Sequence, residues 1–324
     1  MKKISIIVTV HNRKACVQNI LNQINEQVST SNSEKIFTIL VDDGSTDGTK
    51  ELIKNNFPPV HLLEGDGFLW WTGGIVKGTE YAIKILDVDF VVWLNDDVFL
   101  ADNFIENLLN LCANSKYEEM IVGGIVRDKT YPNWIVYSGI RKGKHIHHIN
   151  CFSSEQELEV SNLNGNIVVV PRLVIDKIGL PDAIKFPQIG ADFEYIKRAN
   201  KFGFKAISTS LLQGTTNYTV ADVMRYMPYW MQWCLHPDFC KKYQVVKGLR
   251  TMKATQNVHF FINIRNPDLR NVPKWRYELC YLNKLLKILA VNFLPKTSVE
   301  AKVYNYLENR GTPEEMIRAV MVQK

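Results

Sequence analysis

Cysteine motifs that bind metals or form redox centres are absent from this chain of 324 residues. None of its cysteines forms a CxxC pair or shows zinc-finger spacing; they are Cys16, Cys112, Cys151, Cys234, Cys240 and Cys280. The start also lacks the apolar core of a signal peptide, because Met1-Lys2-Lys3 leads directly into a short strand-like run at residues 4–10. We therefore expect reduced thiols and a cytoplasmic protein.

A hydrophobic run long enough to cross a membrane is also missing. The most apolar C-terminal segment, residues 285–294, is interrupted by Lys287 and is about half as long as a membrane span needs to be. Such a segment is able to lie on a bilayer but not to cross it.

Positive charge is scarce in the first two thirds of the chain and concentrated in the rest. Residues 1–218 carry 22 Lys and Arg against 25 Asp and Glu, whereas residues 219–324 carry 17 against 8, so the net charges are −3 and +9. A basic extension suggests an anionic partner such as a membrane leaflet, a lipid diphosphate or a nucleic acid. We expect peripheral contact with the inner face of the plasma membrane and no nucleic acid. A solvated helical surface and contacts within an oligomer are the alternatives.

Glycine is absent where two classes of nucleotide-binding enzyme need it. After the first predicted strand the chain reads His11-Asn12-Arg13-Lys14. A dinucleotide dehydrogenase requires GxGxxG at this point, and a sugar-nucleotide-forming nucleotidyltransferase requires a glycine-rich basic loop. The sequence therefore disfavours both classes.

Short apolar runs alternate with helical periodicity in the first hundred residues. We predict strands at residues 4–10, 36–41, 60–63 and 90–94, helices at residues 15–27, 49–55 and 75–86, and a glycine-rich loop at residues 65–74. This order is typical of βαβ units around a mostly parallel sheet. Further on we predict helices at residues 103–113, 172–178 and 190–202 and strands at residues 121–126 and 167–170, and a helical region divided by prolines past residue 218.

Acidic and amide side chains stand directly after two of the predicted strands. Asp42 and Asp43 follow one strand, and Asn95, Asp96 and Asp97 follow another. Ligands of open α/β sheets bind beyond the carboxyl ends of the strands, so we expect these tips to share one crevice. Carboxylate oxygens suit Mg²⁺ or Mn²⁺, and such a cation would neutralise a diphosphate leaving group.

The tip of the first strand adds Thr9, His11 and Asn12. Its backbone groups and the histidine ring are suited to hold a nucleotide base. The carboxylate of Asp42 is suited to accept a hydrogen bond from a base N–H. Together the three tips predict a site for a cation and a phosphate-bearing nucleotide.

These motifs in combination resemble the family 2 glycosyltransferases of the GT-A fold, and most closely bacterial rhamnosyltransferase-like members. The resemblance covers roughly residues 4–217. It rests on VTVHN at residues 8–12, VDDGSTD at 41–47, LNDD at 94–97, GNIVVVPR at 165–172 and GADFEYIKRA at 190–199. Each motif alone would be weak.

The resemblance implies an α/β protein with a Rossmann-like, mostly parallel central sheet flanked by helices. Residues 1–218 would form the nucleotide-sugar-binding and catalytic domain, and residues 219–324 a basic helical extension. The implied activity is inverting transfer of a hexose or deoxyhexose from a nucleoside-diphosphate sugar. The acceptor would be a hydroxyl of a glycan or lipid-linked molecule in bacterial surface polysaccharide synthesis.

The same resemblance suggests roles for individual residues. Asp42 would bind the base, Asp97 the metal, and Asp96 the metal or the ribose. Asp192 would be the general base that deprotonates the acceptor hydroxyl. Lys77 is a candidate diphosphate contact and Trp71 a candidate stacking surface for a sugar or base.

Several positions depart from the family pattern. Asn95 stands where many members have an acid, Ala191 replaces the acid that often precedes the base, and Gln213 lies where many relatives have a histidine near the metal. No Gln-x-x-Arg-Trp motif occurs, which argues for transfer of one or a few sugars rather than processive synthesis.

Structural roles are the alternatives for most of these residues. Asp42 and Asp43 are also suited to an Asx-type turn, and Asp47 to capping the following helix. Glu194 is better explained as a first-turn residue favoured by the helix dipole. For Trp71, a hydrophobic plug beneath its loop is the alternative to stacking on a sugar or base. The alternative function is a catalytically silent GT-A-fold protein that binds glycans or acts as a scaffold.

Overall fold

The computed structural model describes residues 2–31, 35–266 and 272–322. The chain forms two compact units, each described by itself below. The first comprises Met1–Pro187 with Ala191–Thr216, and the second comprises Gln188–Gly190 with Asn217–Lys324. The chain passes from the sheet-containing unit to the helical one directly after the last strand of the sheet.

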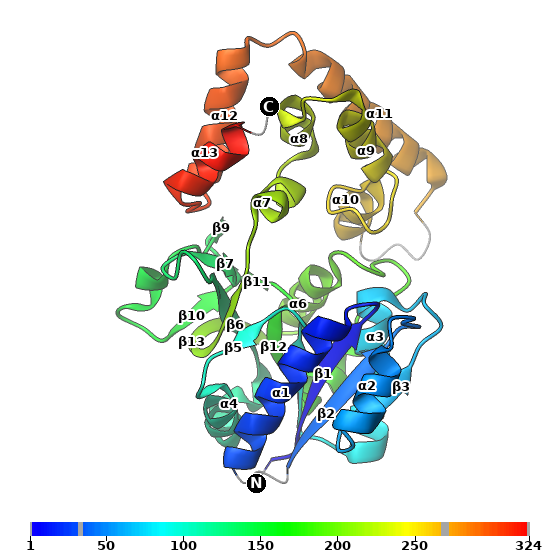
Figure 1. The fold of residues 1–324 in the computed structure, drawn as a ribbon, viewed down its shortest axis with the longest axis vertical. Coiled ribbons are helices and arrows are strands. Elements are labelled where there is room, and N and C mark those ends of the chain that lie inside the picture. Colours follow the sequence, from blue (N-terminus) through cyan, green and yellow to red (C-terminus); the bar gives the residue numbers. More distant parts are fainter. Residues whose placement is uncertain (1, 32–34, 267–271, 323–324) are drawn as a thin grey trace. The chain divides into compact units, whose positions relative to one another are not determined.

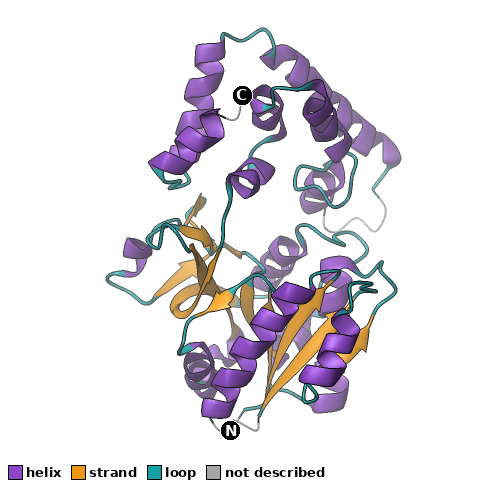
Figure 2. Ribbon diagram, in the orientation of Figure 1, coloured by secondary structure: helices purple, strands orange, loops and turns teal. Residues whose placement is uncertain are grey.

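A curled mixed sheet forms the centre of the first unit (Figures 1 and 2). In spatial order its strands are β10 (Glu157–Val160), β13 (Lys205–Thr216), β6 (Met120–Asp128), β12 (Ile167–Pro171), β4 (Phe90–Leu94), β1 (Ile4–Val10), β2 (Ile36–Asp42) and β3 (His61–Glu64). Two short strands, β5 (Phe99–Leu100) and β7 (Ile135–Tyr137), pair with β13 and β6, while β8 (Gly139–Arg141), β9 (Lys144–His145) and β11 (Asn162–Leu163) form a small separate sheet.

The strands of the first half are parallel, as their βαβ pattern predicts. β2 pairs in parallel with both β1 and β3, and β1 pairs in parallel with β4. β12 then inserts antiparallel between β4 and β6, and the long β13 pairs in parallel with β6. The insertion of β12 places the start of that strand beside the end of β4, where the acidic motif lies.

Helices cover both faces of this sheet because the buried strands alternate their side chains between two apolar clusters. Ile4, Ile6 and Val8 face one cluster with helices α1 (Lys14–Thr30), α2 (Thr49–Asn56) and α4 (Phe104–Ala113). Ile7 faces the other with α3 (Trp70–Tyr81), α5 (Arg172–Ile178) and α6 (Ala191–Lys201). A π-helical turn, η1 (Ala82–Leu86), and two 3₁₀ helices, η2 (Ser115–Glu119) and η3 (Ile149–Phe152), complete the unit.

Helix α3 begins earlier than its glycine content predicts. It starts at Trp70, inside the segment expected to be a loop, and the loop proper ends at residue 69. The carboxylate of Asp43 accepts hydrogen bonds from the backbone N–H groups of Gly67, Leu69 and Trp70, and so satisfies donors at the start of this helix. Gly74 serves packing, since a Cβ there would lie 2.7 Å from Cγ2 of Thr9.

The second unit is helical, which confirms the expectation for the basic extension. Its helices are α7 (Val220–Tyr226), α8 (Tyr229–Leu235), α9 (Phe239–Gly248), α10 (Val258–Arg265), α11 (Lys274–Val291), α12 (Lys296–Glu308) and α13 (Glu314–Val322). Tyr229, Val245, Leu249 and Ile288 form one small apolar cluster in it. Among the described residues, no helix combines the length and the apolar character that crossing a membrane requires.

Candidate active site

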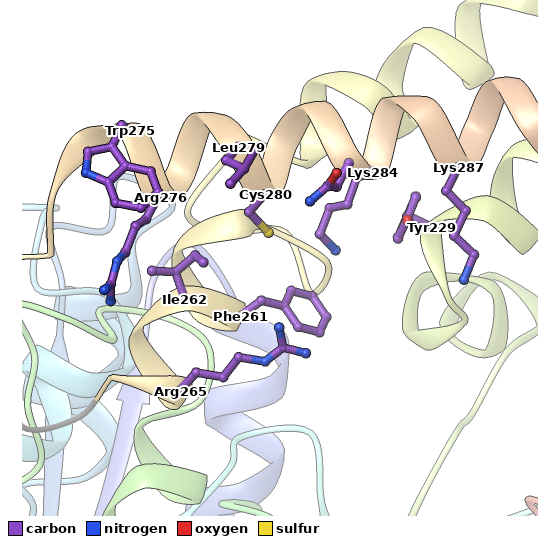
Figure 3. A pocket seen from close by; sticks show the side chains of 11 residues that line it. Tyr229, Phe261, Ile262, Arg265, Trp275, Arg276, Leu279, Cys280, Lys284 and Lys287 are labelled. Carbon is purple, nitrogen blue, oxygen red and sulfur yellow. The ribbon is translucent and has the colours of Figure 1, made fainter.

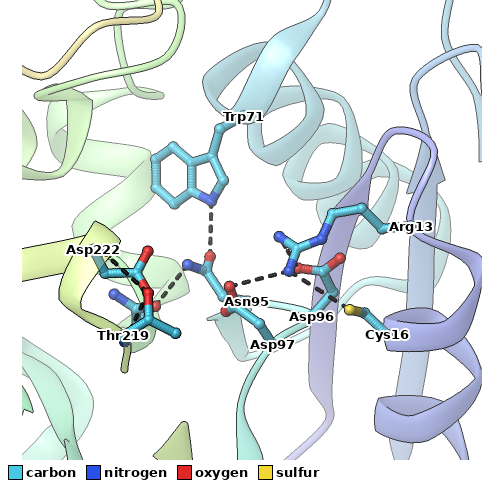
Figure 4. A network of polar contacts seen from close by, with 9 residues as sticks. Arg13, Cys16, Trp71, Asn95, Asp96, Asp97, Thr219 and Asp222 are labelled. Atoms are coloured by element: carbon cyan, nitrogen blue, oxygen red, sulfur yellow. Dashed lines mark hydrogen bonds and ion pairs between the residues drawn. The ribbon is translucent and has the colours of Figure 1, made fainter. Parts of the chain in front are cut away.

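The acidic pair after β4 is held by a guanidinium from the neighbouring strand tip. Arg13, just after β1, forms ion pairs with Asp96 Oδ1 at 3.0 Å and with Asp97 Oδ2 at 3.2 Å (Figure 4). β1 and β4 are adjacent and parallel, so their carboxyl ends meet at one edge of the sheet. The Arg13 guanidinium therefore lies between the two carboxylates that are predicted to bind the metal.

Asp96 is the buried member of this pair. Its side chain is only 5% exposed, whereas that of Asp97 is 43% exposed. Burial raises the pKa of Asp96 to about 7, while Arg13 opposes the rise and Asp97 adds to it. Within the described part of the chain, Asp96 Oδ2 is a buried oxygen without a hydrogen-bond partner. An acceptor oxygen in that position is suited to a further ligand, because unsatisfied buried polar atoms are costly.

Asn95 connects the end of β4 to the start of β12. Its backbone N–H donates to the carbonyl of Asn166 at 3.0 Å, and its side-chain Nδ2 donates to Asn166 Oδ1 at 2.7 Å. The indole N–H of Trp71 donates to Asn95 Oδ1 at 3.1 Å. Asn95 therefore acts as a junction between α3, β4 and β12, and its amide satisfies both neighbours where a carboxylate would lack the donor for Asn166.

Asp192 joins the same junction through Gly165, the residue directly before Asn166. Its Oδ2 accepts from the backbone N–H of Gly165 at 2.9 Å, and its Oδ1 accepts from the N–H of Phe193 at 2.8 Å. Desolvation raises the pKa of Asp192, and these two backbone donors oppose the rise. A carboxylate with a raised pKa is a better proton acceptor near neutral pH than an ordinary one.

Gly165 is required by the close approach of Trp71. A Cβ at position 165 would lie 2.9 Å from two ring carbons of Trp71 and 3.4 Å from the Cβ of Asp192. The rings of Trp71 and Trp93 also pack edge to face, with 5.9 Å between their centres. The rings of Trp93 and Tyr195 of α6 lie 5.3 Å apart, centre to centre. Trp71 thus packs against Gly165 close to Asp192 and begins a row of edge-to-face aromatic contacts that continues through Trp93 to Tyr195.

The turn after β2 is fixed by its own side chains. Asp42 is buried, and its Oδ1 accepts from the backbone N–H of Ser45, three residues along the chain, at 3.0 Å. His11 Nδ1 lies 2.6 Å from the carbonyl of Asp43, and Asn12 Oδ1 accepts from the N–H of Thr46 at 2.7 Å. The tips of β1 and β2 are therefore tied together, and the Asn12 carboxamide oxygen already has a local partner.

Two further candidates lie beside this turn and toward the sheet edge. Thr9 pairs with Val41 on β2 and packs against α3 at Gly74. The ammonium of Lys77 donates to the carbonyl of Glu64 at the end of β3. Because β3 is three strands from β4, that carbonyl is roughly 14 Å from the Asp96 tip by strand spacing. The structure does not bring Lys77 together with the acidic pair.

Structural roles account for several of the remaining residues. Asp47 Oδ1 accepts from the N–H and hydroxyl of Thr49, the first residue of α2, but the N-cap position of this helix is occupied by Gly48 and not by Asp47. Glu194 pairs with Arg198 one turn later at 2.8 Å. Gln213 donates its amide to the carbonyl of Ser210 at 2.6 Å.

Sequence reasoning missed Arg13 and Asn166 as members of the site. Arg13 became relevant only with the strand order, which puts β1 beside β4. Asn166 became relevant through the antiparallel register of β12 against β4, in which Ile167 stands opposite Leu94. Asn166 directly precedes an apolar run and Arg13 follows another after two residues, so a sequence signal existed for both. An apolar run does not reveal, however, which strand will pair with it.

The donor set suits a divalent cation that is completed by a substrate. In the described ranges, no three His, Cys, Asp or Glu side chains converge into a ready-made metal site. Asp97 and the free oxygen of Asp96 would supply carboxylate ligands, and Mg²⁺-type sites commonly combine one or two carboxylates with substrate phosphates and water. The residues present therefore fit a cation that binds together with a diphosphate.

The sequence and the fold of this chain are similar to those of known glycosyltransferases. Residues 5–158 match the sequence model described as glycosyl transferase family 2. An uncharacterized glycosyltransferase of Rickettsia typhi is 24% identical over 185 residues, which cover 55% of this chain and 53% of the relative. The chain thus matches about half the length of that curated relative.

Two solved structures share the fold. The mannosyltransferase PcManGT from Pyrobaculum calidifontis, solved with GDP-Man and Mn²⁺, aligns with 99% of this chain and 85% of its own at 16% identity and a TM-score of 0.53. GalNAc-T7, solved with UDP, GalNAc and Mn²⁺, aligns with 67% of this chain and 43% of its own at 13% identity and a TM-score of 0.50. The fold is that of the GT-A glycosyltransferases. Residues 5–158 resemble the domain described as glycosyl transferase family 2.

Proposed function

We propose that this protein is an inverting, metal-dependent glycosyltransferase. It moves a hexose or deoxyhexose from a nucleoside-diphosphate sugar to a hydroxyl of a glycan or lipid-linked acceptor. We assign it to bacterial surface polysaccharide synthesis and to the rhamnosyltransferase-like branch of the family. The family 2 match over residues 5–158 supports this proposal, as do the solved structures of similar fold, one with GDP-Man and Mn²⁺ and one with UDP, GalNAc and Mn²⁺.

One structural observation carries the proposal. The antiparallel pairing of β4 and β12 puts Asn95 against Asn166, so Asp96 and Asp97 lie at the same sheet edge as Gly165, which binds Asp192. The nucleotide site and the base that we propose would therefore adjoin at one junction. Inverting transfer needs that combination, because the base acts on the acceptor while the leaving group is stabilised elsewhere.

We assign donor binding to the tips of β1 and β2. Asp42 would accept from the base, with Thr9, His11 and Asn12 shaping the base pocket mainly through the tied backbone. Asp96 and Asp97 would hold Mg²⁺ or Mn²⁺, which when bound neutralises the diphosphate leaving group. The remote position of Lys77 supports a contact with the base end rather than with the diphosphate.

We assign acceptor activation to Asp192. Its two backbone hydrogen bonds fix the carboxylate orientation, and its raised pKa favours proton uptake from a hydroxyl. Trp71, packed against Gly165, would present a ring face or edge to a sugar beside that carboxylate. The oxocarbenium-like transition state of glycosyl transfer would form between Asp192 and the diphosphate.

The proposal is tested by a thermal-shift screen of nucleoside diphosphates and sugar nucleotides with and without Mn²⁺, followed by transfer assays with the donor found. Asp97→Asn is expected to abolish the Mn²⁺-dependent part of nucleotide binding. Asp102→Asn, an exposed acid five residues away, is the matched control and should bind as the parent does. Equal Mn²⁺-dependent binding by parent and Asp97→Asn protein would contradict the assignment.

A catalytically silent GT-A-fold protein is the second candidate, and the ion pairs of Arg13 favour it. A guanidinium pairs with both Asp96 and Asp97, and Ala191 stands directly before Asp192 where an acid often precedes the base. Such a protein would bind glycans yet show no metal-dependent affinity for any nucleotide. Calorimetry with nucleoside diphosphates in the presence and absence of Mn²⁺ separates the two functions.

A further inference from the structure

One face of α11 in the second unit carries a line of exposed apolar side chains. The members within the helix are between 50% and 62% exposed, and Phe293, just beyond its end, is 89% exposed; the helix members are Trp275, Leu279, Leu282, Leu286 and Leu289. Steps of three and four residues place them along a single stripe of the helix. We call these six residues the α11 stripe.

The opposite face of α11 is already used for packing. Lys284, Ile288 and Val291 are its buried residues, and Ile288 joins the apolar cluster with Tyr229 and Leu249. The stripe is therefore additional to the apolar side that holds the helix in its unit. A second apolar face of about 27 Å, the length of an 18-residue helix, is typical of a surface that contacts something else.

A cationic hollow adjoins the stripe. A cavity of about 520 Å³ lies between α8, α10 and α11, and Trp275 and Leu279 of the stripe form part of its wall (Figure 3). Its charged lining consists of Arg265, Arg276, Lys284 and Lys287, and the described lining includes no carboxylate. The cavity therefore offers positive charge beside apolar surface.

Lys284 is the buried cation of this cavity. Only 7% of the residue is exposed, and its Nζ lies 3.8 Å from the ring centre of Phe261 and 4.3 Å from that of Tyr229. Desolvation lowers the pKa of Lys284 to about 8, so most of these ammonium groups are still charged at pH 7. Ring faces hold the charge but do not neutralise it. Arg265, from the end of α10, also lines the cavity near Phe261 (Figure 3).

The one acidic residue of α11 does not weaken this positive field. Glu278 forms an ion pair with Arg250 at 2.5 Å. The helix itself contributes Lys274, Arg276, Lys284 and Lys287. Residues 219–324 as a whole carry a net charge of +9. An apolar stripe with cations beside it is complementary to a partner that has an apolar interior and an anionic outer layer.

We propose that the α11 stripe inserts into the surface of an anionic phospholipid bilayer, with a lipid phosphate group bound in the adjoining cavity by Arg265 and Lys284. Apolar side chains of an interfacial helix enter the headgroup and acyl boundary, while basic residues near it attract anionic lipid. The stripe gives the membrane affinity, and the cavity gives the preference for a phosphate headgroup. This inference does not depend on the proposed transferase activity.

The first test measures co-sedimentation of the full chain with vesicles. Vesicles of phosphatidylcholine alone are compared with vesicles that also contain phosphatidic acid, at low and high salt. We expect binding to the anionic vesicles that weakens with salt. The double substitution Leu282→Ser and Leu286→Ser, outside the cavity lining, should weaken binding by at least roughly tenfold, because two half-exposed leucines lose their apolar transfer. Phe239→Ser, at a residue 77% exposed on α9, is the matched control and should bind like the parent.

The second test separates the cavity from the stripe. Lys284→Met keeps a long apolar side chain over the rings and removes the charge. It should reduce the preference for phosphatidic acid by about fivefold while leaving the weaker binding to phosphatidylcholine in place. Lys302→Met, an exposed lysine of α12, is the control for net charge and should keep the preference. Thermal unfolding of each variant verifies that it is folded.

Three results would overturn the proposal. One is the absence of binding to anionic vesicles. Another is saturable binding of hexyl phosphate in solution without vesicle binding, which would make the cavity a site for a soluble phosphate. The third is a light-scattering mass of a dimer that the Leu282 and Leu286 substitutions dissociate, because a second copy would then cover the stripe. Mn²⁺-dependent nucleotide binding, measured in parallel, should be unaffected by the stripe substitutions, so either proposal is able to fail alone.

Discussion

Arg13→Gln is the substitution that examines the acidic site most closely. In the metal-free protein, Arg13 pairs with both Asp96 and Asp97. A divalent cation that uses the same carboxylates has to displace this guanidinium. We therefore expect opposite effects of the substitution: a less stable protein in the absence of metal and a tighter metal site.

The magnitude follows from the exposure of the three side chains. A hydrogen bond to a charged group contributes about 1.5–3 kcal/mol, but Arg13 is 43% exposed, so solvent screening reduces the value. We expect a loss of about 1–2 kcal/mol in the free energy of unfolding at pH 8 without metal. The same energy, no longer needed to displace Arg13, corresponds to Mn²⁺ binding that is about 5–30 times tighter.

The pH dependence distinguishes this electrostatic effect from simple loss of packing. The pKa of Asp96 is raised to about 7, and Arg13 holds it below the value that burial alone would give. At pH 5.5 Asp96 is mostly protonated and pairs weakly with Arg13, so the destabilisation by Arg13→Gln should shrink. Urea unfolding at the two pH values and calorimetric Mn²⁺ titration measure both quantities. Lys14→Gln, which removes the adjacent positive charge, is the control. An Mn²⁺ affinity that falls in Arg13→Gln, or a destabilisation equal at both pH values, would refute the reasoning.

Three further outcomes are expected. Because the pKa of Asp96 is raised to about 7 from an ordinary 3.8, the folded metal-free protein binds more protons than the unfolded chain between these values. Stability should therefore fall by roughly 1 kcal/mol from pH 6 to pH 8, and an unchanged slope in Asp96→Asn unfolding curves would show that another group is responsible. The raised pKa of Asp192 predicts that kcat/KM declines on acidification at a pH above the ordinary aspartate range, since the base must be deprotonated; a profile flat down to pH 4 would contradict its role. Gly165→Ala places a Cβ 2.9 Å from the Trp71 ring and should reduce stability by about 1–3 kcal/mol with a change in tryptophan fluorescence, whereas Gly143→Ala, at an open position with positive φ, should leave that fluorescence unchanged.

Local patterns predicted the first half of the fold well. The strand over residues 4–10 and the helix over residues 172–178 agree with β1 and α5, because strong periodicity and flanking polar residues define them. The predicted start of α3 at residue 75 was wrong, because the glycines before it suggested a loop, whereas the helix begins at Trp70. Only the structure reveals that Asp43 caps that helix and that Gly74 is needed for contact with Thr9.

The sequence predicted which residues of the candidate site follow the ends of individual strands, but not how those strands are arranged. Asp96, Asp97 and Asp192 emerge from motifs, yet the motifs state neither which strands are neighbours nor which groups are already paired. The insertion of β12 beside β4 brings Asn166 into the site. The adjacency of β1 and β4 brings in Arg13. Both depend on long-range sheet pairing, which a short motif does not encode.

The α11 stripe illustrates a different gap. The sequence of residues 274–291 is apolar at many positions, and the charge of residues 219–324 points to an anionic partner. Which apolar residues face the unit and which are exposed follows only from packing, because Ile288 and Leu286 are equally apolar but only Ile288 is buried.

The central claim is that Asp192 is the base of a sugar transfer at the junction of β4 and β12. It is tested most directly by transfer from the nucleotide sugar identified in the thermal-shift screen, with Mn²⁺ present, by parent and Asp192→Asn protein. We expect an inverted anomeric product from the parent. For the variant we expect a rate lower by at least about 10²-fold with unchanged nucleotide affinity. Transfer by Asp192→Asn at the parental rate would contradict this claim.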